Sequence, residues 1–283
     1  MKKGTEATGN PKDNREDLTP EEFRKRILHF YQGHRRDFPW RNTRDPYRIL
    51  VSEIMLQQTQ VKRVQDLYPG FISRFPDFSA LDATPVEDLL RAWQGLGYNR
   101  RALALKNTAS RIMKEWNGLL PDNEESLRSL PGVGKATAAA VQAFAFGKPS
   151  LLIETNIRRV FIHCYFRDRP VVSDGEILPL VAVTLDAENP RDWYYALMDY
   201  GSYLGKTREN PNRRSRQYKK QSPFRGSVRQ VRGRILSFLV GRGCTPISDL
   251  YRELGLPAER GDPVLATLMN EGFIVRDGEF VKI

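Results

Sequence analysis

Two acidic side chains stand in surroundings that would give them opposite protonation states. Glu53 lies in a stretch of helical apolar spacing, with Ile54 and Met55 beside it. Apolar neighbours withdraw a carboxyl from water, which raises its pKa and prepares it to donate a proton near neutral pH. Glu154 directly precedes a helical segment at 155–166, and a helix N-terminus stabilises the ionised form of a carboxylate. The pair suits a reaction that needs one protonated and one charged carboxyl.

A glycine-containing turn is a second candidate site. Residues 130–135 (LPGVGK) lie between two helical segments. Gly132 and Gly134 allow a tight hairpin whose backbone N–H groups point outward, and the following helix adds the positive end of its dipole. Lys135 adds a full positive charge. The stretch predicts a phosphate contact without sequence preference, and an ordinary connection between two helices is the alternative.

The net charge of the chain is concentrated in one segment. The 283 residues carry 45 Lys and Arg against 34 Asp and Glu, a net charge of +11. Eleven basic residues and one acid fall between Gly205 and Arg234, so the remainder of the chain is nearly neutral. Such an excess is typical of a surface that contacts a polyanion, nucleic acid first, although a solvated basic linker is the alternative. Five of these cations are candidate phosphate contacts: Arg213, Arg214, Arg216, Lys219 and Lys220.

The composition argues against several classes of protein. No apolar run approaches the ~18 residues of a membrane-spanning helix, and residues 1–20 contain no apolar core of a secretory signal. Cys164 and Cys244 are the two cysteines, too few for a disulfide framework or a four-cysteine metal site. This usage fits a reducing, intracellular environment. The three histidines are isolated along the sequence, and we expect no metal site.

Apolar spacing predicts an all-α domain from 19 to 204. Residues 1–18 are polar and are expected to be a disordered tail, and Thr19-Pro20-Glu21-Glu22 is typical of a capped helix start. Helical spacing runs without interruption from 47 to 68. Further helices are predicted at 86–93, 100–116, 124–129, 136–146, 155–166, 174–187 and 190–203.

A linker and a second domain are predicted to follow. Residues 205–227 lack apolar periodicity and are predicted to be a basic linker. Residues 228–283 are predicted to be a winged-helix-like module, with short helices at 228–240, 247–254 and 263–269 and a β-hairpin around Asp277-Gly278. No basic residue falls between Asp262 and Asn270, which argues against base readout by the third of these helices.

Three motifs together carry a family resemblance. Residues 51–60 read VSEIMLQQTQ, residues 95–98 read GLGY, and the glycine turn follows at 130–135. With these motifs the chain resembles the helix–hairpin–helix DNA glycosylases over about residues 20–204, and most of all the MutY-type adenine glycosylases. The resemblance implies a two-lobed helical fold, here followed by the winged-helix-like module. It also implies an enzyme that flips a nucleotide out of duplex DNA and hydrolyses its N-glycosidic bond.

The resemblance assigns roles to the candidate acids. Glu53 matches the catalytic glutamate of the family, which protonates the departing base. Glu154 matches a position usually occupied by aspartate, whose charge would stabilise an oxocarbenium-like sugar. Asn156 matches a residue that orients this carboxylate. Ala136 stands where bifunctional relatives carry a Schiff-base lysine, so the resemblance implies direct hydrolysis by water.

Further matches concern DNA contacts, and two departures separate the chain from the family. Gln57, Gln58 and Tyr98 match residues that wedge the duplex and contact the orphaned strand. Gly205 stands where the first of four cluster-binding cysteines would be, so no iron–sulfur cofactor is expected. We expect the basic segment to take over phosphate contacts from the missing loop. The C-terminal module is too short to be the 8-oxoguanine-recognition domain of the family.

The expected function is that of a monofunctional glycosylase in base excision repair. Its partner would be double-stranded DNA that carries a damaged or mispaired base, most of all adenine in a mispair. A mismatch thymine or uracil glycosylase and a non-catalytic module for distorted DNA are the alternatives. We expect a cytoplasmic, nucleoid-associated monomer without a membrane partner, and the C-terminal module is a candidate surface for a repair-protein partner.

Overall fold

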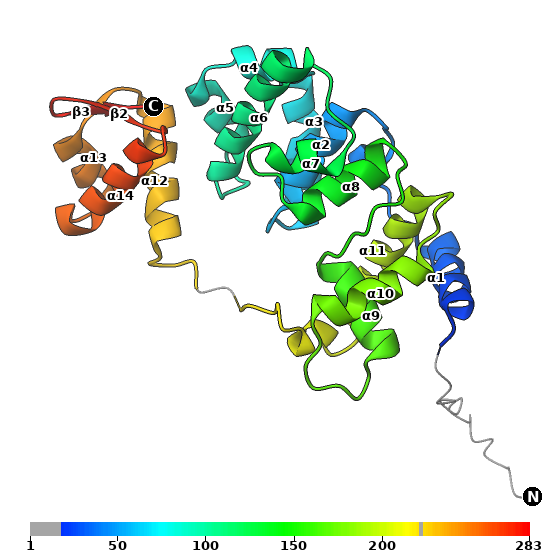
Figure 1. The fold of residues 1–283 in the computed structure, drawn as a ribbon. Coiled ribbons are helices and arrows are strands. Elements are labelled where there is room, and N and C mark those ends of the chain that lie inside the picture. The colour runs from blue at the N-terminus through cyan, green and yellow to red at the C-terminus, as the bar shows by residue number, and fades with distance from the viewer. Residues whose placement is uncertain (1–17, 221–222) are drawn as a thin grey trace, which may run out of the picture.

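The computed structural model describes residues 18–220 and 223–283, and helices dominate it (Figure 1). The disordered tail predicted at 1–18 lies almost wholly outside the described residues. The helices up to the basic segment are α1 (Pro20–His34), α2 (Pro46–Leu56), α3 (Val61–Arg74), α4 (Phe78–Ala83), α5 (Val86–Trp93), α6 (Arg100–Trp116), α7 (Glu124–Ser129), α8 (Lys135–Ala145), α9 (Thr155–Tyr165), α10 (Asp174–Thr184) and α11 (Pro190–Thr207). Two short 3₁₀ helices accompany them, η1 (Pro39–Arg41) and η2 (Pro211–Arg214).

Two apolar cores divide these helices into two lobes, as predicted. One core is built from α2 to α8, and the other from α1, α9, α10 and α11. Helix α8 borders both, because Ala138 and Val141 belong to the first core and Ala139 and Ala143 to the second. The small side chains of α8 therefore let the two lobes meet closely along one helix.

The predicted start of α1 is confirmed in detail. Pro20 is the first helical residue and Thr19 is the N-cap. The backbone N–H of Glu22 donates to Thr19 Oγ1 at 3.3 Å, and the backbone N–H of Thr19 donates to Glu22 Oε2 at 2.9 Å. Both ends of this reciprocal pair satisfy N–H groups that a helix start otherwise leaves without a partner.

The structure differs from the prediction in the stretch from 47 to 68. The predicted helix is interrupted between α2 and α3, where Gln58 adopts a left-handed backbone conformation with φ of 54°. The apolar spacing continues across this break because both helices pack on the same core, so periodicity alone does not reveal it. The interruption falls on the residues of the VSEIMLQQTQ motif that were expected to contact DNA.

The predicted linker is partly folded onto the second lobe. Helix α11 extends to Thr207, and η2 packs against α9. Ser215 forms a parallel β-bridge with Val172, and Asn212 is buried with its Nδ2 donating to the carbonyl of Thr155 at 2.8 Å. Among the described residues, 217–220 and 223–227 form no helix or strand before α12 begins (Figure 1).

The C-terminal module has the predicted three helices and hairpin, with one additional short strand. In chain order it contains α12 (Val228–Arg242), β1 (Thr245–Pro246), α13 (Ile247–Leu254), α14 (Ala258–Asn270), β2 (Val275–Asp277) and β3 (Phe280–Lys282). The strands form an antiparallel sheet in the order β1-β3-β2, with Val281 opposite both Thr245 and Arg276. This arrangement is winged-helix-like. Helix α12 packs against α5, and its apolar residues are continuous with the core of the first lobe.

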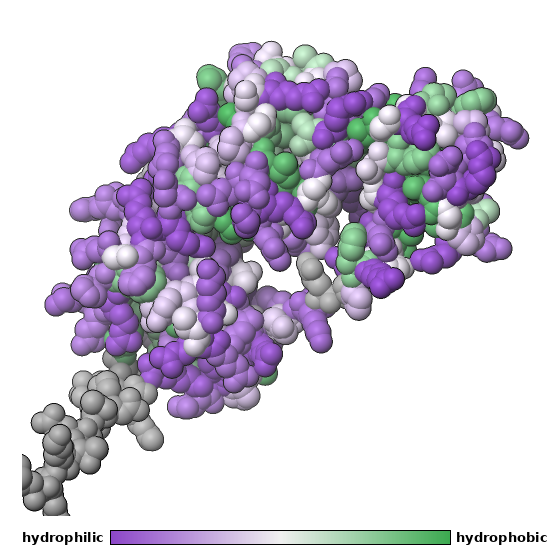
Figure 2. Space-filling view, turned by 180° about the vertical axis from the view of Figure 1, so that it is seen from behind, coloured by the Kyte–Doolittle hydropathy of each residue, from purple (hydrophilic) through white to green (hydrophobic). Residues whose placement is uncertain are grey.

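None of the helices in the described ranges combines the length and hydrophobicity that crossing a membrane requires. The face of the molecule in Figure 2 is mostly hydrophilic, and its hydrophobic residues form small patches.

Close packing of α9 on α11 depends on a glycine. A Cβ atom built on Gly201 would lie 2.3 Å from the backbone oxygen of Asn156, far inside a normal contact distance. The neighbouring atoms include the backbone of α9, which cannot turn away as a flexible side chain could. Gly201 therefore fixes the distance between α11 and the start of α9, where Glu154 is located.

We expect Gly201→Ala to lower the free energy of unfolding by about 1 to 3 kcal/mol, the usual cost of overpacking. The control is Gly233→Ala in α12, where an added Cβ would meet no atom within 4 Å. There the better helix propensity of alanine should raise stability by up to about 1 kcal/mol. Urea denaturation of both variants measures the difference, and equal stabilities would contradict this account of the α9–α11 contact.

Candidate active site and nucleic-acid interface

Helix α2 holds Glu53 at the border between the two lobes. The helix begins because Asp45 Oδ1 accepts the backbone N–H groups of Tyr47 and Arg48 at 2.9 and 3.2 Å, with Pro46 as the first helical residue. Two turns later, Glu53 is flanked by the buried residues Ser52 and Ile54.

The environment of Glu53 favours its protonated form. Its side chain is only partly exposed, and its carboxyl makes no hydrogen bond with any residue in 18–220 or 223–283. Burial raises its pKa from the ordinary 4.5 to about 8, and the negative charge of Glu154 acts in the same direction. Arg41 opposes both effects. The structure therefore supports a carboxyl that is protonated at neutral pH, as the apolar neighbours in the sequence predict.

Glu154 is the N-cap residue of α9. Its Oε1 accepts the backbone N–H groups of Asn156 and Ile157 at 2.7 and 3.0 Å. Burial raises the pKa of Glu154, and the two N–H donors and the nearby Arg158 and Arg159 oppose this increase. The sequence-based expectation considered only the helix N-terminus, whereas the structure adds a larger desolvation effect of opposite sign. Ile49 of α2 and Ile157 of α9 belong to the same apolar core, so the fold places the helices of the two acids at one lobe border. The charge of Glu154 raises the pKa of Glu53.

A chain of hydrogen bonds fixes the orientation of Asn156 beside Glu154. Asn156 Oδ1 accepts from Arg159 Nη1 at 2.9 Å, so its Nδ2 faces Glu154 Oε2, 3.4 Å away. Arg159 Nη1 also donates to the carbonyl of Gly201 at 2.7 Å, and its Nε donates to Asn210 Oδ1 at 3.2 Å. The acid is thus tied through two side chains to α11 and to the segment that follows it.

Arg41 is a site residue that the sequence analysis did not identify. It is buried in η1, and its Nη2 lies 2.9 Å from Asp199 Oδ1. Its guanidinium carbon lies 4.3 Å from the centre of the Tyr195 ring. Asp199 also accepts from Arg36 Nε at 2.6 Å. No periodic pattern marks Arg41 in the sequence, because a single arginine in a turn-rich stretch gives no indication that it is buried.

The glycine turn and α8 form the predicted hairpin. Gly132 has φ of 77°, and an added Cβ would lie 3.0 Å from the Cβ of Ala104, so both conformation and space require glycine. Gly134 is the N-cap of α8 without a side-chain cap, and Lys135 is exposed in the first turn. The uncapped N–H groups and the lysine form a positive surface suited to a phosphate. Ala136 is exposed at the same end of the helix.

Gln57 connects the hairpin to the end of α2. Its Nε2 donates to the carbonyl of Gly132 at 3.0 Å and to Thr137 Oγ1 at 3.1 Å. Gln57 was expected to contact DNA, and in the structure its amide N–H groups are already engaged by the hairpin. Gln58, whose backbone is left-handed, is the second glutamine of the motif and lies at the break between α2 and α3.

A buried arginine holds both predicted wedge segments in place. The two terminal nitrogens of Arg101 lie 2.6 to 3.2 Å from six oxygen atoms, which belong to Ile54, Met55, Gln57, Thr59, Leu96 and Gly97. Burial lowers the pKa of Arg101 to about 10, which leaves it charged at neutral pH. The guanidinium of Arg101 faces the protein interior and is therefore not available to a DNA phosphate.

Tyr98 lies beside this arginine at the surface. Its backbone is left-handed, with φ of 48°, and 36% of the residue is exposed. The guanidinium carbons of Arg101 and Arg229 lie 5.5 and 5.8 Å from the centre of its ring. Arg229 belongs to α12, so the C-terminal module reaches the predicted wedge residue.

The five candidate cations of the basic segment divide into two groups. Arg214 was expected to contact phosphates, but its Nη1 donates to the carbonyls of Arg167 and Arg169 at 2.6 and 3.1 Å. These bonds satisfy backbone oxygens just after α9, so Arg214 has a structural role. Arg213, Arg216, Lys219 and Lys220 are exposed, and Arg213 forms an exposed ion pair with Glu209 at 3.1 Å.

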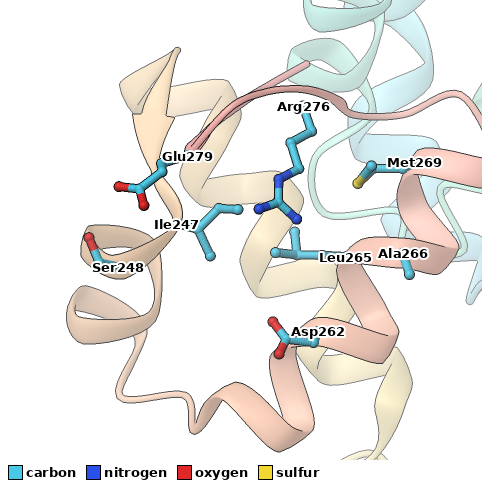
Figure 3. Close-up of a pocket in the computed structure, with 8 residues that line it drawn as sticks. All are labelled: Ile247, Ser248, Asp262, Leu265, Ala266, Met269, Arg276 and Glu279. Carbon is cyan, nitrogen blue, oxygen red and sulfur yellow. The ribbon is translucent and has the colours of Figure 1, made fainter.

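The outer face of the C-terminal module is not strongly basic. Helix α14 begins earlier than predicted and includes Arg260, which donates to the carbonyl of Gly226 at 2.9 Å. A hollow of about 510 Å³ lies between α13, α14 and β2 (Figure 3). Its charged lining residues are Asp262, Glu279 and Arg276, beside apolar residues that include Leu265 and Met269. Two acids against one base make this hollow unsuited to phosphate.

A four-cysteine iron–sulfur cluster does not fit this chain. Cys164 lies in α9 and the exposed Cys244 precedes β1. A Cβ at Gly205 would lie 2.5 Å from Arg159 Nη1, so a polar side chain fills the place next to it.

The fold and these residues define a class: a two-lobed helical protein with a glycine hairpin at the start of α8 and two acids at the border of its lobes. Residues 51–174 match the HhH-GPD superfamily base excision DNA repair proteins. The adenine DNA glycosylase of Mycolicibacterium smegmatis is 33% identical over 276 residues, which cover 90% of this chain and 94% of that protein. The chain belongs to the HhH-GPD superfamily of base excision DNA repair proteins.

Two further similarities concern only part of the chain or of the relative. The adenine DNA glycosylase of Buchnera aphidicola is 36% identical over 187 residues, which cover 64% of this chain and 52% of that protein. The structure of a thermostable thymine-DNA glycosylase superposes with a TM-score of 0.60 at 31% identity, and covers 68% of this chain and 90% of the other. The chain thus spans about half the length of the Buchnera relative.

The raised pKa of Glu53 predicts a pH-dependent cost in stability. Because its pKa is about 8 in the folded protein and near 4.5 when unperturbed, the unfolded state releases this proton first as pH rises. The folded state therefore loses stability progressively between about pH 4.5 and pH 8. Glu53→Gln removes this loss, because glutamine does not titrate. A difference of one in pKa between the folded and unfolded states corresponds to about 1.4 kcal/mol of stability.

We expect Glu53→Gln to gain stability relative to the wild type between about pH 5 and about pH 9, by a few kcal/mol at most, in urea denaturation. Glu115→Gln is the control, because the ion-paired Glu115 has a lowered pKa and stays ionised throughout that range. A stability difference between wild type and Glu53→Gln that does not change with pH would contradict the assignment.

Proposed function

We propose that the protein is a monofunctional DNA glycosylase that excises adenine from a mispair, with Glu53 as the general acid and Glu154 as the stabilising carboxylate. The observation that carries this proposal is the pair of acids at the border of the lobes. Glu53 has no hydrogen-bond partner among the described residues and a pKa raised to about 8, whereas Glu154 is held by two backbone N–H groups. One acid is prepared to give a proton and the other to carry a charge.

The proposed reaction uses these two states in turn. Glu53 donates its proton to the base as the bond between base and sugar breaks and its electron pair leaves with the base. Positive charge develops on the sugar, and the carboxylate of Glu154 stabilises it electrostatically. Water then adds to the sugar carbon and loses a proton to a carboxylate. Ala136 offers no amine, so no Schiff base forms at the position where a lysine would attack.

The choice of adenine rests on similarity and on the sequence motif at 51–60. The relatives that support it are named adenine DNA glycosylases. A mismatch thymine or uracil glycosylase is the second candidate, because a thymine-DNA glycosylase structure superposes on this fold. A non-catalytic binding module is less well supported, since the charge of an acid near the phosphates of bound DNA would only weaken binding.

A substrate panel tests these candidates. Duplexes that carry adenine opposite 8-oxoguanine or guanine, thymine or uracil opposite guanine, hypoxanthine, or an oxidised pyrimidine are incubated with the protein, and abasic sites are scored. Abasic sites in the adenine duplexes are expected. Cleavage of thymine or uracil alone would favour the second candidate, and tight binding without any excision would favour the binding module.

We expect Glu53→Gln to lower the single-turnover excision rate by about 10² to 10⁴, the usual contribution of general acid catalysis, with duplex binding retained. In the wild type the rate should fall about tenfold for each pH unit above about 8, where Glu53 loses its proton. The rate should also fall at low pH, where Glu154 becomes protonated. Because the pKa of Glu154 is raised, this fall should begin at a higher pH than it would for an ordinary glutamate. Full activity of Glu53→Gln would refute its role as the acid.

We further propose that the exposed cations of the basic segment contact DNA phosphates. Arg213, Arg216, Lys219 and Lys220 carry charge at the surface, next to the lobe that holds Glu154. Arg214 is excluded because its guanidinium binds backbone carbonyls. Each phosphate contact releases condensed counterions, which makes the affinity fall as salt rises.

We expect replacement of these four residues by glutamine to flatten the dependence of duplex affinity on salt. The slope of log K against log salt should decrease in magnitude by about 0.9 for each phosphate that the variant no longer neutralises. Glutamine at four exposed cations elsewhere, Lys25, Arg26, Lys114 and Arg242, is the matched control for net charge. Equal slopes for the two variants would show that the segment makes no specific contribution.

A further inference from the structure

The C-terminal module forms a polar contact with Tyr98 in addition to its apolar packing on α5. Arg229 Nη1 donates to Tyr98 Oη at 2.8 Å, and the same guanidinium carbon lies 5.8 Å from the ring centre. Arg229 is in the first turn of α12. Tyr98 lies in the loop between α5 and α6. A side chain of the module therefore contacts the residue that was expected to wedge the duplex.

The loop that carries Tyr98 is unusual in its backbone. Gly95, Gly97 and Tyr98 have φ values of 89°, 69° and 48°. A left-handed conformation is unfavourable for tyrosine and persists only where neighbouring groups hold it. Arg101 supplies part of that support, with its Nη2 donating to the carbonyl of Gly97 at 2.9 Å. Arg101 fixes the backbone of the loop, whereas Arg229 contacts the phenol at the end of the side chain.

Further contacts fix the position of α12 relative to this loop. Glu271, at the end of α14, accepts from Arg232 of the module at 2.5 Å and from Arg100 of the first lobe. These two arginines lower the pKa of Glu271 and keep it ionised. Arg91 of α5 donates to the carbonyl of Val240 at 3.1 Å. Bonds on two sides of α12, together with the shared apolar core, hold Arg229 at one distance from Tyr98.

We propose that the C-terminal module is part of the DNA-contacting site, and that Arg229 acts as a positioning residue that holds the Tyr98 side chain ready to enter the duplex. This inference rests on the proposed function together with the expectation from the sequence that Tyr98 wedges the duplex. A side chain already held in one orientation loses less conformational freedom on insertion, which favours the bound state. The module thus contributes to base flipping through α12.

The test is a double-mutant cycle between Tyr98 and Arg229. Tyr98→Phe keeps the ring and removes the Oη acceptor, and Arg229→Met removes the donor and keeps a similar stem. The control Arg242→Met removes the same charge at the exposed far end of α12. Binding is measured with a duplex that carries a stable abasic-site analogue, which requires no excision. Unstacking is measured as the fluorescence of 2-aminopurine at the target position, and thermal unfolding shows whether the module stays docked.

We expect Tyr98→Phe and Arg229→Met each to weaken analogue binding and unstacking about three- to tenfold, with the double variant no worse than either. Arg229→Lys, which can still donate to the phenol, should recover part of the loss, and Arg242→Met should match the wild type. Additive losses, or an Arg229→Met variant that equals Arg242→Met, would overturn the inference. If Tyr98 and Arg229 show the expected coupling in binding and unstacking but the protein excises no base, the result would contradict the proposed function and leave this inference supported.

Discussion

The buried guanidinium of Arg101 is the interaction on which the arrangement of the site depends. It is withdrawn from water, and its N–H groups donate to backbone and hydroxyl oxygens of two segments. One segment is the end of α2 and the turn that follows it, just after Glu53, and the other is the loop that carries Tyr98. A single rigid cation therefore sets the distance between the acid-bearing helix and the wedge residue. Burying a charge without an acidic partner is costly, and six oxygen ligands at 2.6 to 3.2 Å reduce that cost here.

A second constraint is electrostatic and concerns how Glu53 keeps its proton. A buried arginine beside a carboxyl would normally lower the pKa of that carboxyl strongly. Arg41 is close enough to act on Glu53, yet its charge is shared with Asp199 at 2.9 Å. Asp199 in turn binds Arg36, so the positive charge is distributed over a network of three side chains. Burial and the charge of Glu154 then outweigh Arg41, and the pKa of Glu53 is raised to about 8.

The sequence predicts much of the helical framework but little of this network. Periodicity locates α5, α6 and α7 at their observed bounds because each buries one apolar face. It misses the break at Gln58 because the apolar face continues across a local change in backbone. Periodicity also gives no indication of what the arginines contact. By residue type, Arg41, Arg101 and Arg214 are ordinary surface cations. The fold shows that their partners are backbone carbonyls or a buried acid. Glu53 was found because it lies in the VSEIMLQQTQ motif, and Glu154 because it directly precedes a helix.

The basic excess of the chain consequently has two different uses. Part of it is internal: Arg214 binds the carbonyls that follow α9, and Arg232 joins α12 to Glu271. These charges hold the segment and the module in place and are not available to a phosphate. The remainder, which includes Arg213, Arg216, Lys219 and Lys220, is exposed in the stretch that follows the lobe of Glu154. Net charge alone suggests a surface for any polyanion, whereas the structure separates the cations that hold the protein together from the exposed cations that can still meet a polyanion.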